Sequence, residues 1–341
     1  MNINPTVVFP ATRQVAVEDR PMPAFGEGEL LIRTQRSLIS TGTELTILSG
    51  DYEEGSAWKK YARFPFFPGY SNIGEVVDVG PGVDRQWLGR RVGTYGTHAR
   101  FVKGKPSATR PVQREVASDH AAFFTIAEIV MNGVRRGGVT WGEAVAVYGM
   151  GLLGQLTARF CRLAGARPVF CIDTADARLA RVPAGGGFIN INPRRDDPAA
   201  IVREATRERM ADVAFEVTGN PAVIPGECAV LRRGGRLVIL SSPRGKTAFD
   251  FHDLCNAPSY TIIGAHNFSH PEVPTNASPW TQLRHGELFF DLVADGEIDV
   301  EPLISHRRPF TDAPELYRML MNDRSEAMGV VMVWGGRESA V

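Results

Sequence analysis

The segment Gly149-Met150-Gly151-Leu152-Leu153-Gly154 constrains the fold more than any other stretch of this 341-residue chain. It follows a continuous apolar run, residues 144–148, and opens a segment whose apolar residues have helical spacing. In a strand–loop–helix of this kind the first glycine permits a tight turn, the second lets the backbone approach a pyrophosphate, and the third lets the helix pack on the strand. Free N–H groups at the helix start then bind the anion. The sequence therefore predicts a dinucleotide-binding Rossmann unit in which all six residues contact the cofactor.

An acidic residue ends the next apolar run, residues 168–173. Asp173 stands 19 positions after Gly154 (173 − 154 = 19), a spacing at which a carboxylate accepts hydrogen bonds from ribose hydroxyls. The same charge would repel a 2′-phosphate, so the sequence favours NAD(H) over NADP(H). Further candidates for cofactor contact are Arg178, which is equally typical of a solvated helix, Thr218 and Gly264.

Apolar patterning changes twice along the chain. Short strands broken by Pro, Gly and Asp come first and predict an all-β, barrel-like unit; examples are residues 29–37, 74–79 and 89–94. Helical spacing begins near residue 118, with Ser118 or Asp119 as the expected N-cap. Apolar runs then alternate with helical segments, which predicts an α/β fold with a doubly wound parallel sheet.

Three segments follow from this patterning. We expect a β-domain that carries the substrate and catalytic groups at 1–124 and an NAD-binding Rossmann domain at 125–266. A return segment at 267–341, helical and then strand-like, should complete the catalytic domain.

Composition narrows the function classes. Lys+Arg and Asp+Glu number 38 each, so no net charge favours nucleic acid or a membrane surface. There is no apolar stretch long enough to span a bilayer and no signal-like start, and cytoplasmic localisation is expected. None of the four cysteines has the CxxC spacing of a structural zinc site, and they are typical of small buried hydrophobes; they are Cys161, Cys171, Cys228 and Cys255.

Four stretches together resemble the medium-chain dehydrogenases/reductases over nearly the whole chain. They are Thr41-Gly42-Thr43-Glu44 with Gly50, the run from Pro68-Gly69-Tyr70-Ser71 to Val77, the glycine loop, and residues 212–219 with 231–236. The resemblance implies a GroES-like β-barrel domain around the Rossmann domain. It also implies a small-molecule substrate and a homodimer or homotetramer.

Zinc-using members of that family hold the metal with Cys and His at positions that are Thr41 and Tyr70 here, and Ser71 replaces the glutamate that follows the His. A thiolate–imidazole zinc site cannot form from these residues, so no metal is expected. Glu128 lies near the third ligand position, which leaves an unusual site with Glu44 as an alternative. Residues 40–44 and 68–70 resemble two zinc-poor branches, dehydrogenases of sugars, glycosides or cyclitols and bacteriochlorophyllide dehydrogenase; residues 131–135 and 278–280 favour the sugar branch.

Without zinc, a protein group must take the hydroxyl proton while hydride leaves carbon. By resemblance Thr43 matches the relay hydroxyl, and Glu44 and Tyr70 surround the lost metal; Glu44 is the candidate base. Tyr70 is a poor base, because a phenol has an ordinary pKa near 10 and a nearby carboxylate raises it further. The structural alternatives are that Thr43 only caps a turn, that Glu44 is a buried hydrogen-bond partner of a nearby donor and that Tyr70 only fills the vacated pocket. His266 should lie near the nicotinamide end of the last strand. The spacing of the remaining histidines matches no site motif, and they are typical of surface residues or of residues whose hydrogen bonds are made within the fold. They are His98, His120, His252, His270, His285 and His306.

The sequence thus predicts a zinc-independent, NAD-dependent alcohol dehydrogenase acting on a secondary hydroxyl of a sugar, glycoside or cyclitol, or reducing the matching ketone. Two enzymatic alternatives stay open: an NAD(P)H-dependent quinone or enoyl reductase, and oxidation of a hydroxyethyl side chain of a tetrapyrrole. A catalytically silent cofactor-binding protein is the alternative from another class.

Overall fold

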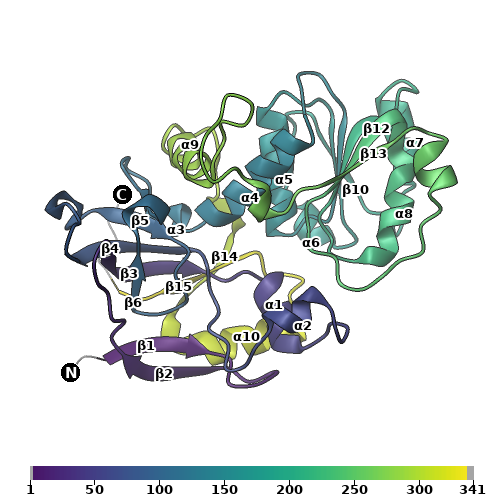
Figure 1. Ribbon diagram of the computed structural model, residues 1–341. Coiled ribbons are helices and arrows are strands. Elements are labelled where there is room, and N and C mark those ends of the chain that lie inside the picture. Colours follow the sequence, from purple (N-terminus) through teal and green to yellow (C-terminus); the bar gives the residue numbers. More distant parts are fainter. Residues whose placement is uncertain (1–2, 336–341) are drawn as a thin grey trace. The chain divides into compact units, whose positions relative to one another are not determined.

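A computed structural model describes residues 3–335, and the chain folds into two compact units (Figure 1). The first unit takes the chain up to residue 126 and again from 282, and the second comprises residues 127–281. The first boundary falls inside helix α4 (Phe124–Arg136), two residues after the expected 124. Residues 267–281, which we expected in the return segment, cluster with the second unit. Contacts with α4 hold them there, since Asn132 bonds Ser269 and Arg135 stacks on Trp280.

The first unit is built on a seven-stranded sheet with the order β14-β15-β3-β4-β5-β7, and β6 also pairs with β3. The strands predicted from alternation are present as β3, β4 and β5. The sheet strands are β3 (Leu30–Leu38), β4 (Asn72–Val79), β5 (Arg91–Thr94), β6 (Phe101–Gly104), β7 (Arg110–Pro111), β14 (Ile304–Pro309) and β15 (Gly329–Val333). A hairpin of β1 (Ile3–Val8) and β2 (Ala16–Pro21) lies outside it.

Apolar side chains of α1 (Thr43–Ser49), α2 (Ala57–Tyr61) and α10 (Ala313–Asn322) pack in a core around Phe9, Ile39, Ile47 and Tyr317. The first unit also contains α3 (Ser118–Ala121) and α9 (Gln282–Ala294). The segment from 282 onward thus supplies two helices and two strands of the first unit.

The second unit is an all-parallel sheet with the order β10-β9-β8-β11-β12-β13. In chain order this is 3-2-1-4-5-6, the arrangement of dinucleotide-binding folds, and the order reverses between β8 and β11. The strands are β8 (Val145–Tyr148), β9 (Val169–Ile172), β10 (Phe188–Ile191), β11 (Ala211–Glu216), β12 (Leu231–Ile239) and β13 (Thr261–Gly264). β10 was missed by the sequence analysis because it is short and only half-buried.

Helices cover both faces of this sheet (Figure 1). α4 and α5 (Leu152–Leu163) lie on one face, and α7 (Pro198–Ala205) and α8 (Ile224–Glu227) on the other; α6 (Asp176–Leu179) follows β9. The predicted α/β fold with a doubly wound parallel sheet is confirmed.

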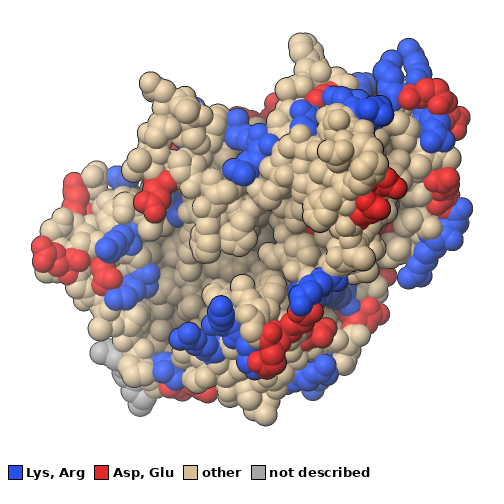
Figure 2. All heavy atoms as spheres, turned by 45° about the vertical axis from the view of Figure 1, so that its right-hand side comes forward, with Lys and Arg blue, Asp and Glu red and all other residues tan. Residues whose placement is uncertain are grey.

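Charged side chains of both signs are interspersed over the face seen in Figure 2, in keeping with the equal totals of 38 basic and 38 acidic residues. Among residues 3–335, no helix is long and apolar enough to cross a membrane.

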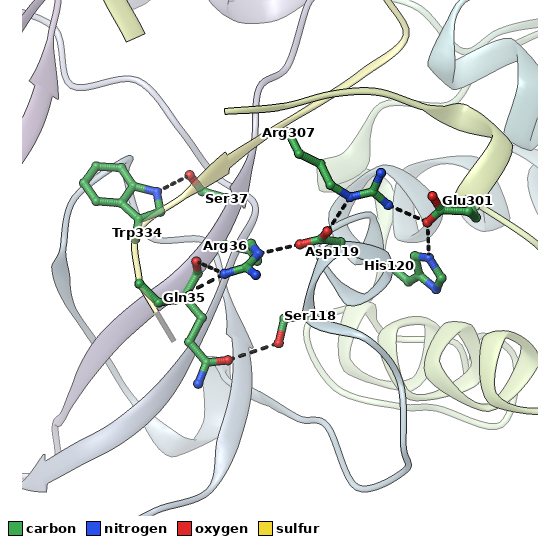
Figure 3. A network of polar contacts seen from close by, with 10 residues as sticks. Gln35, Arg36, Ser37, Ser118, Asp119, His120, Glu301, Arg307 and Trp334 are labelled. Atoms are coloured by element: carbon green, nitrogen blue, oxygen red, sulfur yellow. Dashed lines mark hydrogen bonds and ion pairs between the residues drawn. The ribbon is translucent and has the colours of Figure 1, made fainter. Parts of the chain in front are cut away.

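The expected N-cap at Ser118 or Asp119 is wrong. Helix α3 starts at Ser118 after Ala117, and no side chain caps it. Tertiary partners engage both candidates instead: Ser118 donates to Gln35 Oε1 at 3.0 Å, and Asp119 accepts from Arg36 and Arg307 (Figure 3). The helix predicted to run on from there is interrupted, because α3 ends at Ala121 and α4 begins at Phe124.

The same ion pairs join sequence-distant parts of the first unit (Figure 3). Asp119 bridges the buried Arg36 of β3 and Arg307 of β14, and Arg307 also pairs with Glu301. Glu301 in turn accepts from His120 Nε2 at 2.7 Å. This network, defined by Arg36, Asp119, His120, Glu301 and Arg307, fastens the return segment to β3 and α3.

Candidate active site

The glycine loop of the second unit has two glycines that the fold itself requires. Gly149 has φ of +95°, and a Cβ there would lie 3.0 Å from the backbone nitrogen of Thr218. A Cβ on Gly154 would lie 1.7 Å from the carbonyl oxygen of Gly149. A Cβ on Gly151 would meet nothing within 4 Å, and helix α5 begins after it without a side-chain cap. The loop therefore offers open space and helix N–H groups at Gly151, which fits a dinucleotide pyrophosphate.

Asp173 follows β9 and is 8% exposed. Its carboxylate accepts from the Met150 N–H at 2.7 Å and the Ala175 N–H at 2.8 Å, and Arg178 Nη1 lies 3.6 Å from it. The carboxylate thus fastens the glycine loop to the end of β9. Because a carboxylate has about four acceptor positions, room remains for ribose hydroxyls. Arg178 is ion-paired with Asp173, and its stacking on adenine stays a prediction.

Glu216 ends β11 and was missed by the sequence analysis. Its Oε1 accepts from the Thr218 N–H at 2.7 Å, the Thr218 hydroxyl at 2.6 Å and the Gly219 N–H at 2.8 Å, while Oε2 accepts from the Ser241 hydroxyl. The buried carboxylate therefore fixes the loop that carries Thr218, a predicted cofactor contact. An acid at the end of a mainly apolar strand was the available signal.

A second buried carboxyl, Glu227, lies in the same unit. Neither of its oxygens has a hydrogen-bond partner. Burial, and then the charge of Glu216, raise the pKa of Glu227 to about 9, so this side chain is neutral at pH 7. Nothing in the sequence marked it as unusual.

His266 and Gly264 lie at the carboxyl end of β13. The exposed His266 caps a short turn, because its Nδ1 accepts from the Phe268 N–H at 3.3 Å. Its carbonyl accepts from Asn132, and the carbonyl of Gly264 accepts from Arg136 at 2.9 Å. The Arg135 guanidinium stacks 3.4 Å from the Trp280 ring centroid. The two stretches that favoured the sugar branch, 131–135 and 278–280, therefore meet in the structure.

A hydroxyl cluster in the first unit surrounds Tyr70, which stands where zinc-using members of the family that the sequence resembles have a histidine ligand. Tyr70 donates its hydroxyl to Ser40 Oγ, and Thr43 Oγ1 lies 3.5 Å away. Burial raises the pKa of Tyr70 to about 12, against the lowering effect of hydrogen bonds with Ser40 and Thr43, so the phenol is neutral at ordinary pH. Ser40 was not predicted, although it adjoins the predicted segment.

Thr41 and Ser71, the other two residues that differ from the zinc-using members, also form hydrogen bonds. The Thr41 carbonyl accepts from Arg324 at 3.0 Å, and the Ser71 hydroxyl donates to the Ala122 carbonyl at 2.6 Å. Across residues 3–335, no group of three or more His, Cys, Asp and Glu side chains could hold a metal ion. The side chains at the zinc-ligand positions therefore do not fit that metal.

Glu44 lies in α1 and is 1% exposed. Its carboxylate accepts from the Ser40 N–H at 3.1 Å and from the Tyr317 hydroxyl, and His98 Nε2 lies 3.2 Å from it. The structure thus brings Thr43 and Tyr70 together directly and links Glu44 to them through Ser40. Glu128, the other carboxylate that we considered for a metal, is fully buried in α4 of the second unit.

Family models match both parts of the chain. Residues 26–147 match the alcohol dehydrogenase GroES-like domain, and residues 153–282 match the zinc-binding dehydrogenase domain. The chain belongs to the medium-chain dehydrogenase/reductase superfamily. It is an alcohol dehydrogenase-like oxidoreductase, as the sequence predicted.

Similar members of this superfamily include sorbitol dehydrogenase 2 of Saccharomyces cerevisiae, 24% identical over 93% of this chain and 94% of that protein. L-threonine 3-dehydrogenase of Pyrococcus horikoshii is 27% identical over 84% of this chain and 86% of that protein. Among solved structures, 2R,3R-butanediol dehydrogenase from Bacillus subtilis superposes with a TM-score of 0.81 at 19% identity, covering 97% of this chain and 99% of that one.

Proposed function

We propose that this oxidoreductase is an NAD(H)-dependent, zinc-independent dehydrogenase of a secondary hydroxyl in a polyhydroxylated substrate such as a sugar, glycoside or cyclitol. The observation that carries the proposal is the Tyr70–Ser40–Thr43 hydroxyl cluster, in which Tyr70 replaces a metal ligand of the zinc-using family members. The substrate class is supported by relatives named for sorbitol and L-threonine and by a structural neighbour named for butanediol, because each of those compounds carries a secondary hydroxyl. We further propose that the protein works in the cytoplasm as a homo-oligomer.

The cofactor preference rests on Asp173, whose charge opposes a 2′-phosphate. When bound, NAD supplies the hydride acceptor for the reaction. The glycine loop would hold its pyrophosphate at Gly151 and the start of α5. Thr218, fixed by Glu216, would contact the nicotinamide end.

The chain's own groups handle the proton. The neutral phenol of Tyr70 and the hydroxyl of Thr43 hydrogen-bond the substrate oxygen and orient it. The Glu44 carboxylate is the proposed acceptor of the hydroxyl proton, and it also holds the Ser40 turn, whose side-chain oxygen accepts from the Tyr70 hydroxyl. In the reverse direction the same groups return that proton to the ketone oxygen.

Turnover and metal content test the proposal together. Purified protein should reduce NAD with at least one member of a panel of polyols, glycosides and cyclitols, followed by NADH absorbance, and should contain far less than one zinc per chain. A chelator should leave the rate unchanged. One zinc per chain with activity lost to the chelator would refute zinc independence, and turnover of quinones or enoyl compounds alone would favour the reductase alternative.

Glu44→Gln should lower kcat by about 10²–10⁴-fold, the usual contribution of a general base, while NAD affinity stays unchanged. Tyr70→Phe should lower kcat by a smaller factor, because Thr43 still orients the substrate. Stopped-flow turnover and fluorescence titration of NAD separate the two effects. A Glu44→Gln enzyme with near-normal kcat would remove Glu44 from the mechanism, and His266 would be the next residue to test.

A further inference from the structure

A chain of buried polar side chains runs behind Glu44, entirely within the first unit. Trp334, just after β15, donates its indole N–H to Ser37 Oγ at 2.8 Å. Ser37 Oγ lies 2.9 Å from His98 Nδ1, and His98 Nε2 lies 3.2 Å from the Glu44 carboxylate. Ser37 and His98 are fully buried, and Trp334 is 5% exposed. Apart from Glu44, these side chains belong to no predicted site.

The hydrogen positions along this series of hydrogen bonds follow from the Trp334 end, where the direction of donation is fixed. An indole N–H can only donate, so Ser37 Oγ accepts from Trp334. The Ser37 hydroxyl hydrogen is then available to His98 Nδ1, which leaves the His98 proton on Nε2, directed at Glu44. All donors along the chain therefore face the Glu44 carboxylate. Since the indole at the far end cannot accept a proton, the chain cannot carry one away from Glu44.

Tyr317 of α10 adds another donor to the same carboxylate. Burial, and then the Glu44 charge, raise the pKa of Tyr317 well above its ordinary value, so the phenol keeps its hydrogen. Tyr317, His98 and the Ser40 N–H thus give Glu44 three hydrogen-bond partners, which fix the position of its carboxylate.

The backbone around Ser40 depends on this carboxylate. The Glu44 side chain accepts from the Ser40 N–H at 3.1 Å, and the Glu44 N–H donates to the Ser40 carbonyl at 3.0 Å. These reciprocal bonds fix the turn that precedes α1. Ser40 Oγ in turn receives the Tyr70 hydroxyl, so the orientation of Tyr70 rests on the same turn.

We infer that His98 and Tyr317 are positioning residues, which hold the Glu44 carboxylate in place and thereby fix the Ser40 turn and the Tyr70 hydroxyl. The inference rests on the proposed role of Glu44 in proton transfer. Neither residue touches the reacting atoms; both act through Glu44.

Tyr317→Phe tests the first donor. The ring and its packing remain, and only the hydroxyl is lost. We expect kcat to fall by about 10- to 10²-fold, in line with the cost of a small misplacement, with KM for NAD unchanged. Tyr260→Phe is the matched control: it removes hydroxyl bonds to the Cys228 and Leu231 carbonyls in the other unit and should leave kcat unchanged.

His98 is tested by a pair of variants. Gln can present an N–H to Glu44 and Leu cannot, so His98→Gln should retain more kcat than His98→Leu at equal thermal stability. If His98→Leu does not fold, the kcat of His98→Gln is compared with the kcat of Tyr317→Phe instead. Equal losses of kcat for Gln and Leu, or an unchanged kcat in Tyr317→Phe, would overturn the inference.

A spectroscopic measurement separates this inference from the proposed function. In ¹⁵N-histidine-labelled protein, the His98 signal, identified by its disappearance in His98→Gln, should be that of the Nε2–H tautomer and should persist in Tyr317→Phe. This result does not depend on finding a substrate. An Nδ1–H tautomer would overturn the proton assignment even if a polyol is oxidised, whereas an Nε2–H tautomer without any turnover would contradict only the proposed function.

Discussion

At the scale of single residues, Asp173 combines a structural and a recognition role. Two backbone N–H groups, those of Met150 and Ala175, already bond its carboxylate, so a substitution removes a fastening of the glycine loop as well as a charge. Affinity and stability must therefore be measured side by side for any variant of this residue.

We expect the unaltered protein to bind NAD(H) much more tightly than NADP(H). Asp173→Ser should shift the ratio of the two dissociation constants toward NADP(H) by about tenfold or more, because near a protein surface two charges ~4 Å apart interact by about 4 kcal/mol. Fluorescence titration with both cofactors measures the ratio. Asp173→Asn is the control that keeps one acceptor oxygen without charge. Equal affinities of the unaltered protein for the two cofactors would contradict the assignment.

Glu227 gives a prediction about stability. Its pKa is about 9 in the folded state, raised by burial and by Glu216, against an ordinary 4.5. The folded state therefore holds a proton that the unfolded state has released between these values, and this group makes stability fall as pH rises through that window. Glu227→Gln should raise the free energy of unfolding by on the order of 3 kcal/mol at pH 7, and by much less at pH 5.

Urea unfolding at pH 5, 7 and 9 measures this difference. Glu204→Gln, at an exposed position of α7, is the control and should show no such trend. A difference between the unaltered protein and Glu227→Gln that is the same at all three pH values would mean that Glu227 is not held neutral.

Residues within one local motif were predictable, and residues paired across the fold were not. The glycine loop and Asp173 lie within 25 positions and share a known geometric purpose, so spacing alone identified them. Tyr317 lies 273 positions from Glu44, and His98 lies 54 positions from it. Spacing carries no information about such pairs, because they depend on how β-strands and helices pack. His98 was therefore interpreted as a satisfied histidine, and only the structure identifies its partner.

At the scale of elements, the strand–loop–helix from β8 to α5 contains a glycine needed for folding and a glycine left open for a ligand. Gly154→Ala should destabilise the protein by about 1–3 kcal/mol or more, because its Cβ would overlap the Gly149 carbonyl. Gly151→Ala should leave thermal stability almost unchanged, since nothing lies within 4 Å of the added methyl. It should nevertheless weaken NAD binding, because the pyrophosphate would approach that backbone. Calorimetry of both variants checks this; normal NAD affinity in Gly151→Ala would place the cofactor elsewhere.

Elements also show where local signals fail. Ser118 has the residue type of an N-cap, yet Gln35 engages its hydroxyl and no side chain caps α3. The tertiary bond to β3 outweighs a local preference worth about 1 kcal/mol. The apolar runs at 144–148 and 168–173, by contrast, predicted β8 and β9, because a strand buried on both faces must be apolar throughout.

At the scale of the whole molecule, the ion-pair network of Figure 3 joins the return segment to β3 and α3. Burial raises the pKa of Glu301, but hydrogen bonds from His120 and Arg307 outweigh it, so the net pKa lies below the ordinary 4.5. A carboxyl with a lowered folded pKa stabilises the protein above its unfolded pKa, and the contribution is lost as pH falls through the folded value.

Glu301→Gln should therefore lower Tm by a few °C at most at neutral pH, and the difference from the unaltered protein should disappear in acid, below about pH 4. Scanning calorimetry between pH 3 and 8 measures both. Glu297→Gln, at an exposed position nearby, should change Tm little throughout. A Tm difference that persists at pH 3 would mean that packing, rather than charge, accounts for the effect.

The pairing of β15 with β3 has a consequence for synthesis of the chain. On the side of β3 away from β4, residues 36–38 pair with residues 331–333, and β15 begins 291 positions after β3 ends (329 − 38 = 291). At ribosomal rates of about 5–20 residues per second, this edge of β3 stays unpaired for roughly 15–60 s. The strands of the dinucleotide unit have all been synthesised before β15. A message truncated before residue 329 would release a finished nucleotide fold attached to an open sheet, and unpaired strand edges of this kind template aggregation.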